Sequence, residues 1–159
     1  MNISNIEIII ALFLAYLAYQ NYRLQRDSLR FNLYERRYAT YQTIQKYLSL
    51  IVQKGTIDNT DMNEFNREAY KNEFLFGHEI KEYVDEIWKK SCKLKLYEDL
   101  LKEEPVGKSR TKICEDNSEI LGWIHDQFET SRKLFNKYLR ISIFSLDFKI
   151  KKEIKKFLQ

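Results

Sequence analysis

Turn-forming residues are scarce in this chain. Its 159 residues include four glycines and a single proline, Pro105. Sheets and barrels need frequent turns between short strands, so this scarcity argues against both. A chain of this length fits one core, since single cores commonly occupy about 100–150 residues. We therefore expect an all-α protein built from a few long helices.

Residues that carry chemistry are also few. The two cysteines, Cys92 and Cys114, are too few for a disulfide framework and are typical of a reducing compartment. The two histidines, His78 and His125, do not stand at metal-ligand spacing with each other or with the cysteines. The sequence has no nucleophile elbow, phosphate-binding glycine loop or dinucleotide fingerprint. We therefore expect no enzyme, cofactor, metal site or small-molecule substrate.

Charge is missing from one stretch near the N-terminus, where every residue from Ile8 to Tyr19 is apolar or aromatic. A bilayer core of about 30 Å needs roughly 17–25 helical residues, so this stretch alone is short. A span from Ile3 to Tyr22 meets the length if Glu7 and its polar neighbours lie at the outer interface. A bundle helix at the protein surface would keep a polar stripe, and this stretch has none. We predict a transmembrane anchor over residues 1–22; the alternative is a buried helix of a soluble bundle.

The residues after the apolar stretch predict its orientation. Lys and Arg mark the cytoplasmic side of a membrane, and no basic side chain precedes Arg23. We expect a protein of the inner (cell) membrane with its N-terminus outside and the remainder in the cytoplasm. The predicted interface residues are an aromatic belt and the first arginines: Tyr16, Tyr19, Tyr22, Arg23, Arg26 and Arg30.

Helical spacing continues beyond the predicted anchor. Two apolar rows run side by side, each with seven-residue spacing and the second three residues further along the chain, and together they form a single seam. This seam predicts a helix that reaches Lys54 and ends at Gly55. The side chains of this seam are Leu24, Phe31, Tyr34, Tyr38, Tyr41 and Leu48. We interpret the seam as core or as a protein interface.

Three further helices complete a predicted antiparallel bundle over residues 23–141. The second begins with an N-cap at Asp61 and runs to Phe76. The third covers His78 to about Glu104, and the fourth runs from about Ser109 to Ile141. Gly77, Pro105 and Gly107 supply the breaks between them.

The C-terminal segment, residues 142–159, differs in character because lysines alternate with apolar residues. This pattern predicts a basic amphipathic helix, which either lies on an anionic membrane surface or docks on the bundle as a fifth helix. The residues predicted to contact lipid in the first case are Lys149, Lys151, Lys152, Lys155 and Lys156. The sequence leaves both interpretations open.

The stretch "RFNLYERRYATY" mixes aromatic residues with arginines, as some nucleic-acid-binding surfaces do. Helical spacing places the aromatic residues on the seam and the arginines beside it. The apolar stretch nearby favours lipid headgroups as the partners of these arginines. We therefore do not expect nucleic acid as a partner.

Several segments together resemble an uncharacterised group of small bacterial membrane-anchored helical proteins. The segments are "LRFNLYERRYATYQTIQKYLS", "EFLFGHEIKEYVDEIW", the "EEPVG" turn and "LRI", and they fall within residues 24–141. The group shares a pattern like R-F-x-L-Y-x-R-R-Y followed by F-L-F-G, of which F-L-F-G is the most specific part. The resemblance implies a bacterial helical protein and carries over no site residues.

These observations favour a single-pass membrane-anchored protein whose cytoplasmic helical bundle binds a protein partner or itself, without catalysis. One alternative is a membrane effector, holin-like or defence-associated, that oligomerises and perturbs the bilayer. Its support is a stripe of small residues, Ala11, Ala15 and Ala18, which suits helix packing in membranes. The other alternative is a soluble helical bundle that acts as an adaptor.

Overall fold

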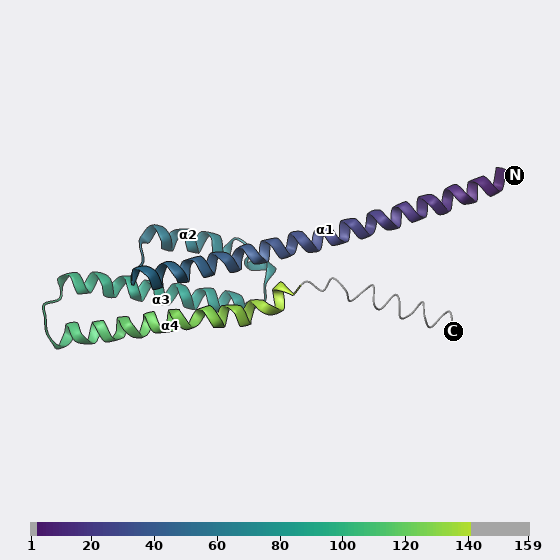
Figure 1. The fold of residues 1–159 in the computed structure, drawn as a ribbon. Coiled ribbons are helices and arrows are strands. Elements are labelled where there is room, and N and C mark those ends of the chain that lie inside the picture. Colours follow the sequence, from purple (N-terminus) through teal and green to yellow (C-terminus); the bar gives the residue numbers. More distant parts are fainter. Residues whose placement is uncertain (1–2, 141–159) are drawn as a thin grey trace, which may run out of the picture. The chain divides into compact units, whose positions relative to one another are not determined.

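The computed structural model describes residues 3–140, with side chains from Ile6 onward. This part of the chain contains no strand, which confirms the all-α class (Figure 1). The chain divides into two compact units, Met1–Arg36 and Arg37–Gln159, whose boundary falls inside the first helix. The helices are α1 (Ile3–Lys54), α2 (Asn59–Tyr70), α3 (His78–Glu103) and α4 (Lys108–Leu139), with a short 3₁₀ helix η1 (Glu73–Leu75) between α2 and α3.

The first unit consists of the N-terminal part of α1. No glycine or proline interrupts α1 from Ile3 to Lys54, so nothing in the sequence ends the helix earlier. Over residues 3–140, no helix combines the length and the apolar character that crossing a membrane requires. The anchor predicted over residues 1–22 is therefore not supported by the structure. Its uninterrupted apolar run, Ile8–Tyr19, covers about 18 Å, against about 30 Å for a bilayer core.

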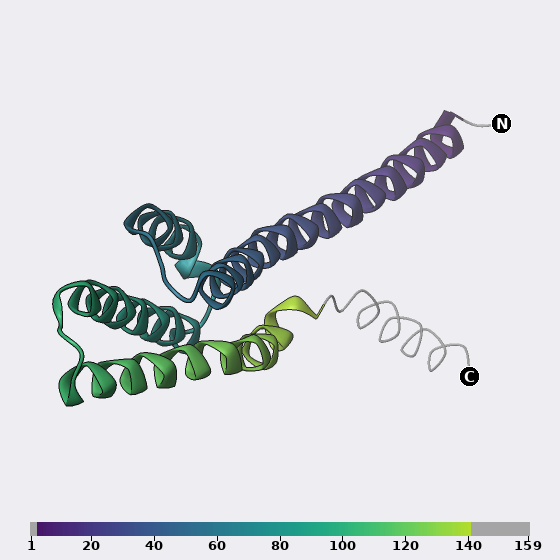
Figure 2. The same ribbon diagram turned by 60° about the vertical axis from the view of Figure 1, so that its left-hand side comes forward.

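In the second unit, α3 and α4 form an antiparallel pair, as Figures 1 and 2 show. The start of α3 contacts the end of α4 through an ion pair between Glu79 and Lys137. At the opposite end, Arg110 of α4 donates hydrogen bonds to the carbonyls of Leu101 and Glu104, both at 2.7 Å. The turn between the two helices contains Pro105, as the sequence predicts.

The C-terminal part of α1 and helix α2 complete the second unit. The ring of Tyr47 on α1 stacks on Phe65 of α2 with centroids 4.0 Å apart. Gln45 of α1 donates a hydrogen bond to Ser131 of α4. These contacts bury a core with residues from all four helices: Ile44, Leu48, Ile51, Phe65, Ile87, Leu94, Ile124 and Phe135.

The structure confirms most of the predicted helix ends. Gly55 has a φ of +68°, which residues with a side chain rarely adopt, and its N–H binds the Ile51 carbonyl at 2.8 Å to close α1. Helices α3 and α4 begin within a residue of their predicted positions.

The prediction for α2 was wrong at both ends. The helix is capped at Asp58, so Asp61 lies in its first turn and is not the N-cap. It ends at Tyr70, six residues before the predicted Phe76, and the chain then forms η1. In this segment the Leu75 carbonyl of η1 accepts a hydrogen bond from Arg37 of α1, a contact distant in sequence.

Candidate membrane and partner surfaces

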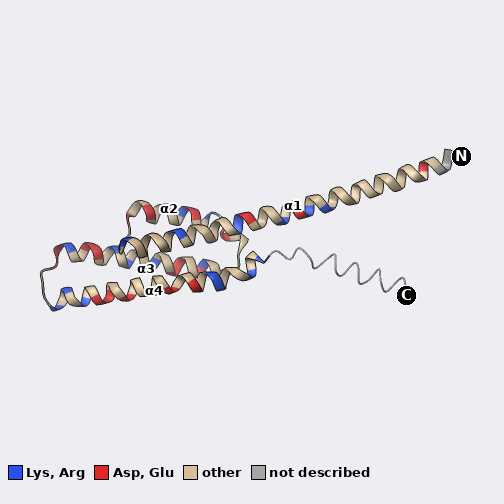
Figure 3. Cartoon of the chain, viewed as in Figure 1, with Lys and Arg blue, Asp and Glu red and all other residues tan. Residues whose placement is uncertain are grey.

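The N-terminal part of α1 exposes a continuous apolar surface. Ile8, Ile9 and Ile10 are 53–58% exposed, and Leu12 is 67% exposed. These side chains point in different directions around the helix, because successive residues are turned by about 100°. No charged residue lies between Glu7 and Arg23, and Figure 3 shows this stretch of α1 in tan, without blue or red. The described residues of the chain therefore leave this surface uncovered on every side of the helix.

The predicted interface residues lie at the C-terminal end of this surface and directly after it. Tyr16, Tyr19 and Tyr22 are exposed, and the Tyr16 hydroxyl accepts a hydrogen bond from Gln20 at 3.0 Å. Arg30 is also exposed, whereas Arg23 and Arg26 are half-buried. Arg26 forms an ion pair with Asp27 at 3.1 Å. The structure thus places these residues on one helix in the predicted order, and their role at a membrane interface stays a prediction.

The predicted seam of α1 divides into two parts. Leu48 is fully buried, and the ring of Tyr41 packs on Phe135 with centroids 5.5 Å apart. Tyr34 is half-buried, and Tyr38 is exposed. Leu24 and Phe31, by contrast, are 68% and 55% exposed. One seven-residue pattern therefore supplies core at its C-terminal end and an open apolar row at its N-terminal end.

A cluster that the sequence did not predict joins three segments of the second unit; we call Arg37, Gly77, Glu79 and Tyr138 the junction cluster. Arg37 donates hydrogen bonds to the carbonyls of Leu75, at 3.1 Å, and Tyr138, at 3.4 Å. Its guanidinium also lies over the Tyr138 ring, 5.3 Å from the centroid. One cation thus connects α1 with the loop before α3 and with the end of α4.

The Tyr138 hydroxyl forms the second half of the junction cluster. It accepts a hydrogen bond from the Gly77 N–H at 2.7 Å and donates one to the Glu79 carboxylate at 2.5 Å. A Cβ at position 77 would stand 2.7 Å from this hydroxyl, closer than carbon and oxygen atoms normally approach. A side chain at position 77 would therefore displace the Tyr138 hydroxyl and the Glu79 carboxylate from their present positions.

Hydrogen bonds lower the pKa values of two carboxyls in the second unit, so we expect the stability of this unit to decrease in acid. Hydrogen bonds from Lys137 and Tyr138 lower the pKa of Glu79 from 4.5 to about 2. Hydrogen bonds from Thr56 and then Lys95 lower the pKa of Glu98 in the same way, also to about 2. A carboxyl whose pKa is lower in the folded state stabilises that state above its unfolded pKa, and this contribution is lost as the pH falls toward the folded pKa.

We therefore expect the free energy of unfolding to stay constant between pH 7 and about pH 5 and to fall between about pH 4.5 and pH 2. Urea titrations at a series of pH values measure this. The matched control is the double variant Glu79→Gln, Glu98→Gln, which lacks both carboxyls. Its stability should be lower at pH 7 and should fall less steeply in acid. An equally steep fall in both proteins would show that other groups cause the acid sensitivity.

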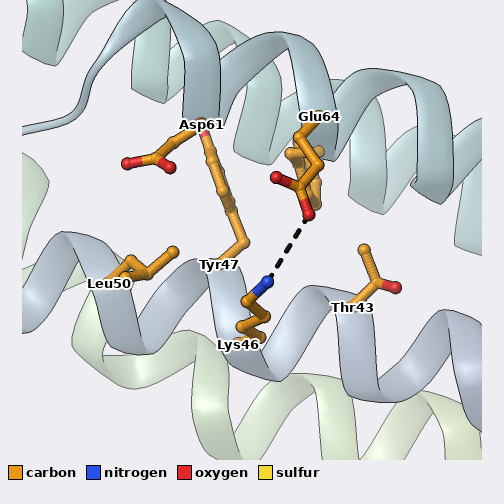
Figure 4. Close-up of a pocket in the computed structure, with 7 residues that line it drawn as sticks. Thr43, Lys46, Tyr47, Leu50, Asp61 and Glu64 are labelled. Atoms are coloured by element: carbon orange, nitrogen blue, oxygen red, sulfur yellow. Dashed lines mark hydrogen bonds and ion pairs between the residues drawn. The ribbon is translucent and has the colours of Figure 1, made fainter.

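One hollow of the second unit is small. It lies between α1 and α2 and has a volume of about 30 Å³, the share of one water molecule in the liquid (Figure 4). Lys46 and Glu64 face each other across it, 3.4 Å apart. The buried Tyr47 hydroxyl, which finds no hydrogen-bond partner among the described residues, belongs to its wall, and burial raises its pKa to about 12. Ligand pockets are typically about 300–1,000 Å³, so this hollow is too small to be one.

A larger hollow of about 430 Å³ lies on the surface between α3 and α4. Its α3 side carries Glu79, Glu82 and Glu86, and its α4 side carries Trp123 and Leu134. Glu79 is already held by Lys137 and Tyr138, and His78 lies 3.3 Å from Glu82. This hollow therefore combines three carboxylates, two of which have partners within the chain, with the Trp123 ring.

Residues capable of metal binding or nucleophilic chemistry stand apart from one another. In residues 3–140, no three or more His, Cys, Asp or Glu side chains gather closely enough to hold a metal ion. Cys92 and Cys114 are both free and exposed. His125 lies on α4 beside Asp126, at 3.7 Å. The expectations of no catalysis and no cofactor stay predictions.

No family model, no curated protein and no solved structure matches this chain. The resemblance to small bacterial membrane-anchored proteins therefore stays a prediction, as do the boundaries at residues 22 and 141. The basic segment 142–159, with Lys149, Lys151, Lys152, Lys155 and Lys156, lies outside the described residues.

Proposed function

We propose that this protein is a bacterial membrane-anchored helical bundle that acts by binding a protein partner or another copy of itself, without catalysis. The apolar N-terminal part of α1 sits in the inner membrane, and the second unit lies in the cytoplasm. The observation that carries the proposal is the exposed apolar surface around Ile8–Tyr19. Soluble monomers rarely leave so continuous an apolar surface in water.

The distribution of this surface favours lipid over a protein partner. A single protein partner covers one face of a helix, whereas lipid surrounds it. The run Ile8–Tyr19 is shorter than a bilayer core, so the proposal places Ile3, Ile6 and the three tyrosines within the membrane boundary as well. Arg23, Arg26 and Arg30 then lie among the headgroups of the inner leaflet, where arginine is favoured.

An alkaline wash of membranes from expressing cells tests this anchoring. The wild-type protein should remain in the pellet after the wash. The double variant Leu12→Lys, Leu14→Lys should move to the supernatant, because a lysine at the centre of a membrane helix costs about 2.5–3.5 kcal/mol on insertion scales. The matched control is Leu24→Lys, Leu29→Lys, which changes two leucines of similar exposure beyond the first arginines and should stay in the pellet. A wild-type protein in the supernatant, or equal release of both variants, would refute the anchoring.

The native cysteines test the orientation without any substitution. Cys92 and Cys114 are exposed and lie in the second unit, which the proposal places in the cytoplasm. A thiol reagent that cannot cross membranes should label them in inverted membrane vesicles and leave them unlabelled in intact cells. Labelling in intact cells would reverse the orientation. Dye entry on overexpression would favour the membrane-effector alternative.

A further inference from the structure

The open part of the α1 seam, Leu24, Phe31 and Tyr34, lies within the first unit, and its seven-residue spacing extends toward the N-terminus; from here on the seam includes this extension. One row contains Ile10, Leu17, Leu24 and Phe31, all exposed. The second row runs beside it, three residues further along the chain, and contains Phe13, Gln20, Asp27 and Tyr34. Two such rows are the a and d positions of a coiled coil, which pack against the same positions of a partner helix.

The charged residues beside these rows indicate what the partner is. Arg23 and Arg30 occupy the g positions, and Ser28 and Glu35 occupy the e positions. In a parallel pair, a g residue faces the e residue five positions later in the other helix, so Arg30 faces Glu35 of the other copy. In an antiparallel pair, g faces g, which would bring arginines of the two copies together. At these flanking positions the sequence is complementary to itself in the parallel direction, whereas the antiparallel direction brings arginines together.

We propose that a second copy of this chain pairs with the first, in parallel, along the α1 rows from Ile10 to Tyr34. Arg30 of each copy then lies beside Glu35 of the other, and Leu24 and Phe31 are buried between the helices. Gln20 faces its own counterpart, and a polar residue in such a row fixes register and direction at some cost in stability. The two Asp27 carboxylates also face each other and repel, and the ion pair of each with Arg26 of its own helix, at 3.1 Å, reduces this repulsion. This inference rests on the proposed function in one respect, because a shared membrane holds both α1 helices in the same direction.

Disulfide cross-linking of the full chain reconstituted in phosphatidylethanolamine–phosphatidylglycerol vesicles tests the pairing. Cys92 and Cys114 are first replaced by serine, and single cysteines are introduced as Gln20→Cys and Asp27→Cys, both on the seam. The matched controls are Gln25→Cys and Asn32→Cys, which are also polar and lie on the outer side of the helix. A disulfide needs Cβ atoms about 3.5–4.5 Å apart, so both seam positions should cross-link at least roughly tenfold faster than both controls. In an antiparallel pair, at most one of the two seam positions can lie opposite the same position of the other copy, so at most one of the two cysteines would cross-link quickly.

Charge reversal tests the partner identity independently. Arg30→Glu or Glu35→Arg alone places like charges opposite each other and should slow cross-linking at position 27. The double variant Arg30→Glu, Glu35→Arg restores opposite charges and should restore the rate. Equal rates at seam and control positions, or no restoration by the double variant, would overturn the pairing.

Flotation of the same vesicles in a density gradient separates the two proposals. Protein that floats without seam-specific cross-links refutes the pairing and leaves the membrane anchoring intact. Protein that fails to float refutes the anchoring, and its cross-linking pattern still decides whether the helices pair.

Discussion

Replacing Phe135 with alanine is expected to lower the free energy of unfolding by about 3–5 kcal/mol. The Phe135 side chain is fully buried on α4. Its ring packs on Tyr41 of α1 and on Phe76 before α3, with centroid distances of 5.5 and 5.3 Å. Removing it leaves a cavity where three segments meet, and long helices cannot collapse into such a cavity without losing other contacts.

Urea unfolding of the full chain in mild detergent, followed by circular dichroism, measures this effect. Phe74→Ala is the matched control, because Phe74 is 91% exposed and its ring contributes little to the core. We expect the control to change the free energy of unfolding by less than about 0.5 kcal/mol. Similar effects of the two substitutions would mean that Phe135 does not lie at the centre of the bundle.

The helix ends that the sequence predicted correctly are those with a local cause. Gly55 ends α1 because it adopts a positive φ, and Pro105 lies in the turn after α3 because it cannot continue a helix. The end of α2 has no such local signal, since no glycine or proline occurs between Tyr70 and Phe76. The segment after Tyr70 instead contacts Arg37, 38 residues away in the sequence, through the Leu75 carbonyl, and local spacing does not indicate such a contact.

Burial along the α1 seam shows a second limit of sequence patterns. Leu24 and Leu48 belong to the same seam, yet Leu48 is fully buried and Leu24 is 68% exposed. Seven-residue spacing indicates which face of a helix is apolar, but neighbouring elements decide whether that face is covered. The junction cluster escaped prediction for a related reason. The acceptors of Arg37 in this cluster are backbone carbonyls, which every residue has, so they leave no mark in the sequence.

The exposed seam and the exposed apolar surface belong to one helix, and this links the two proposals. Ile10 and Leu17 lie both on the surface proposed to contact lipid and on the row proposed to contact a second copy. A helix pair in a membrane satisfies both, because each helix meets its partner on one face and lipid on the others. The second unit would then be held near its counterpart, and its own surfaces would act at a higher local concentration.

Replacing Arg37 with alanine is expected to lower the free energy of unfolding by about 2–3 kcal/mol, because hydrogen bonds to charged groups contribute about 1.5–3 kcal/mol each and this site is only partly buried. The substitution leaves the carbonyls of Leu75 and Tyr138 without their donor. Arg37→Lys should recover little of the loss, because an ammonium group lacks the planar fork that reaches two separate carbonyls.

The matched control for Arg37 is Arg67→Ala on α2, whose partner Glu68 is its neighbour in the sequence. The Arg67 side chain is largely exposed, and an exposed ion pair of this kind contributes at most about 1 kcal/mol. Urea unfolding of all three variants at neutral pH decides between a specific contact and a general effect of charge. If Arg37→Lys were as stable as the wild type, the positive charge would matter and the two-carbonyl bridge would not. If all three variants were equally stable, Arg37 would have no role in joining α1 to the rest of the second unit.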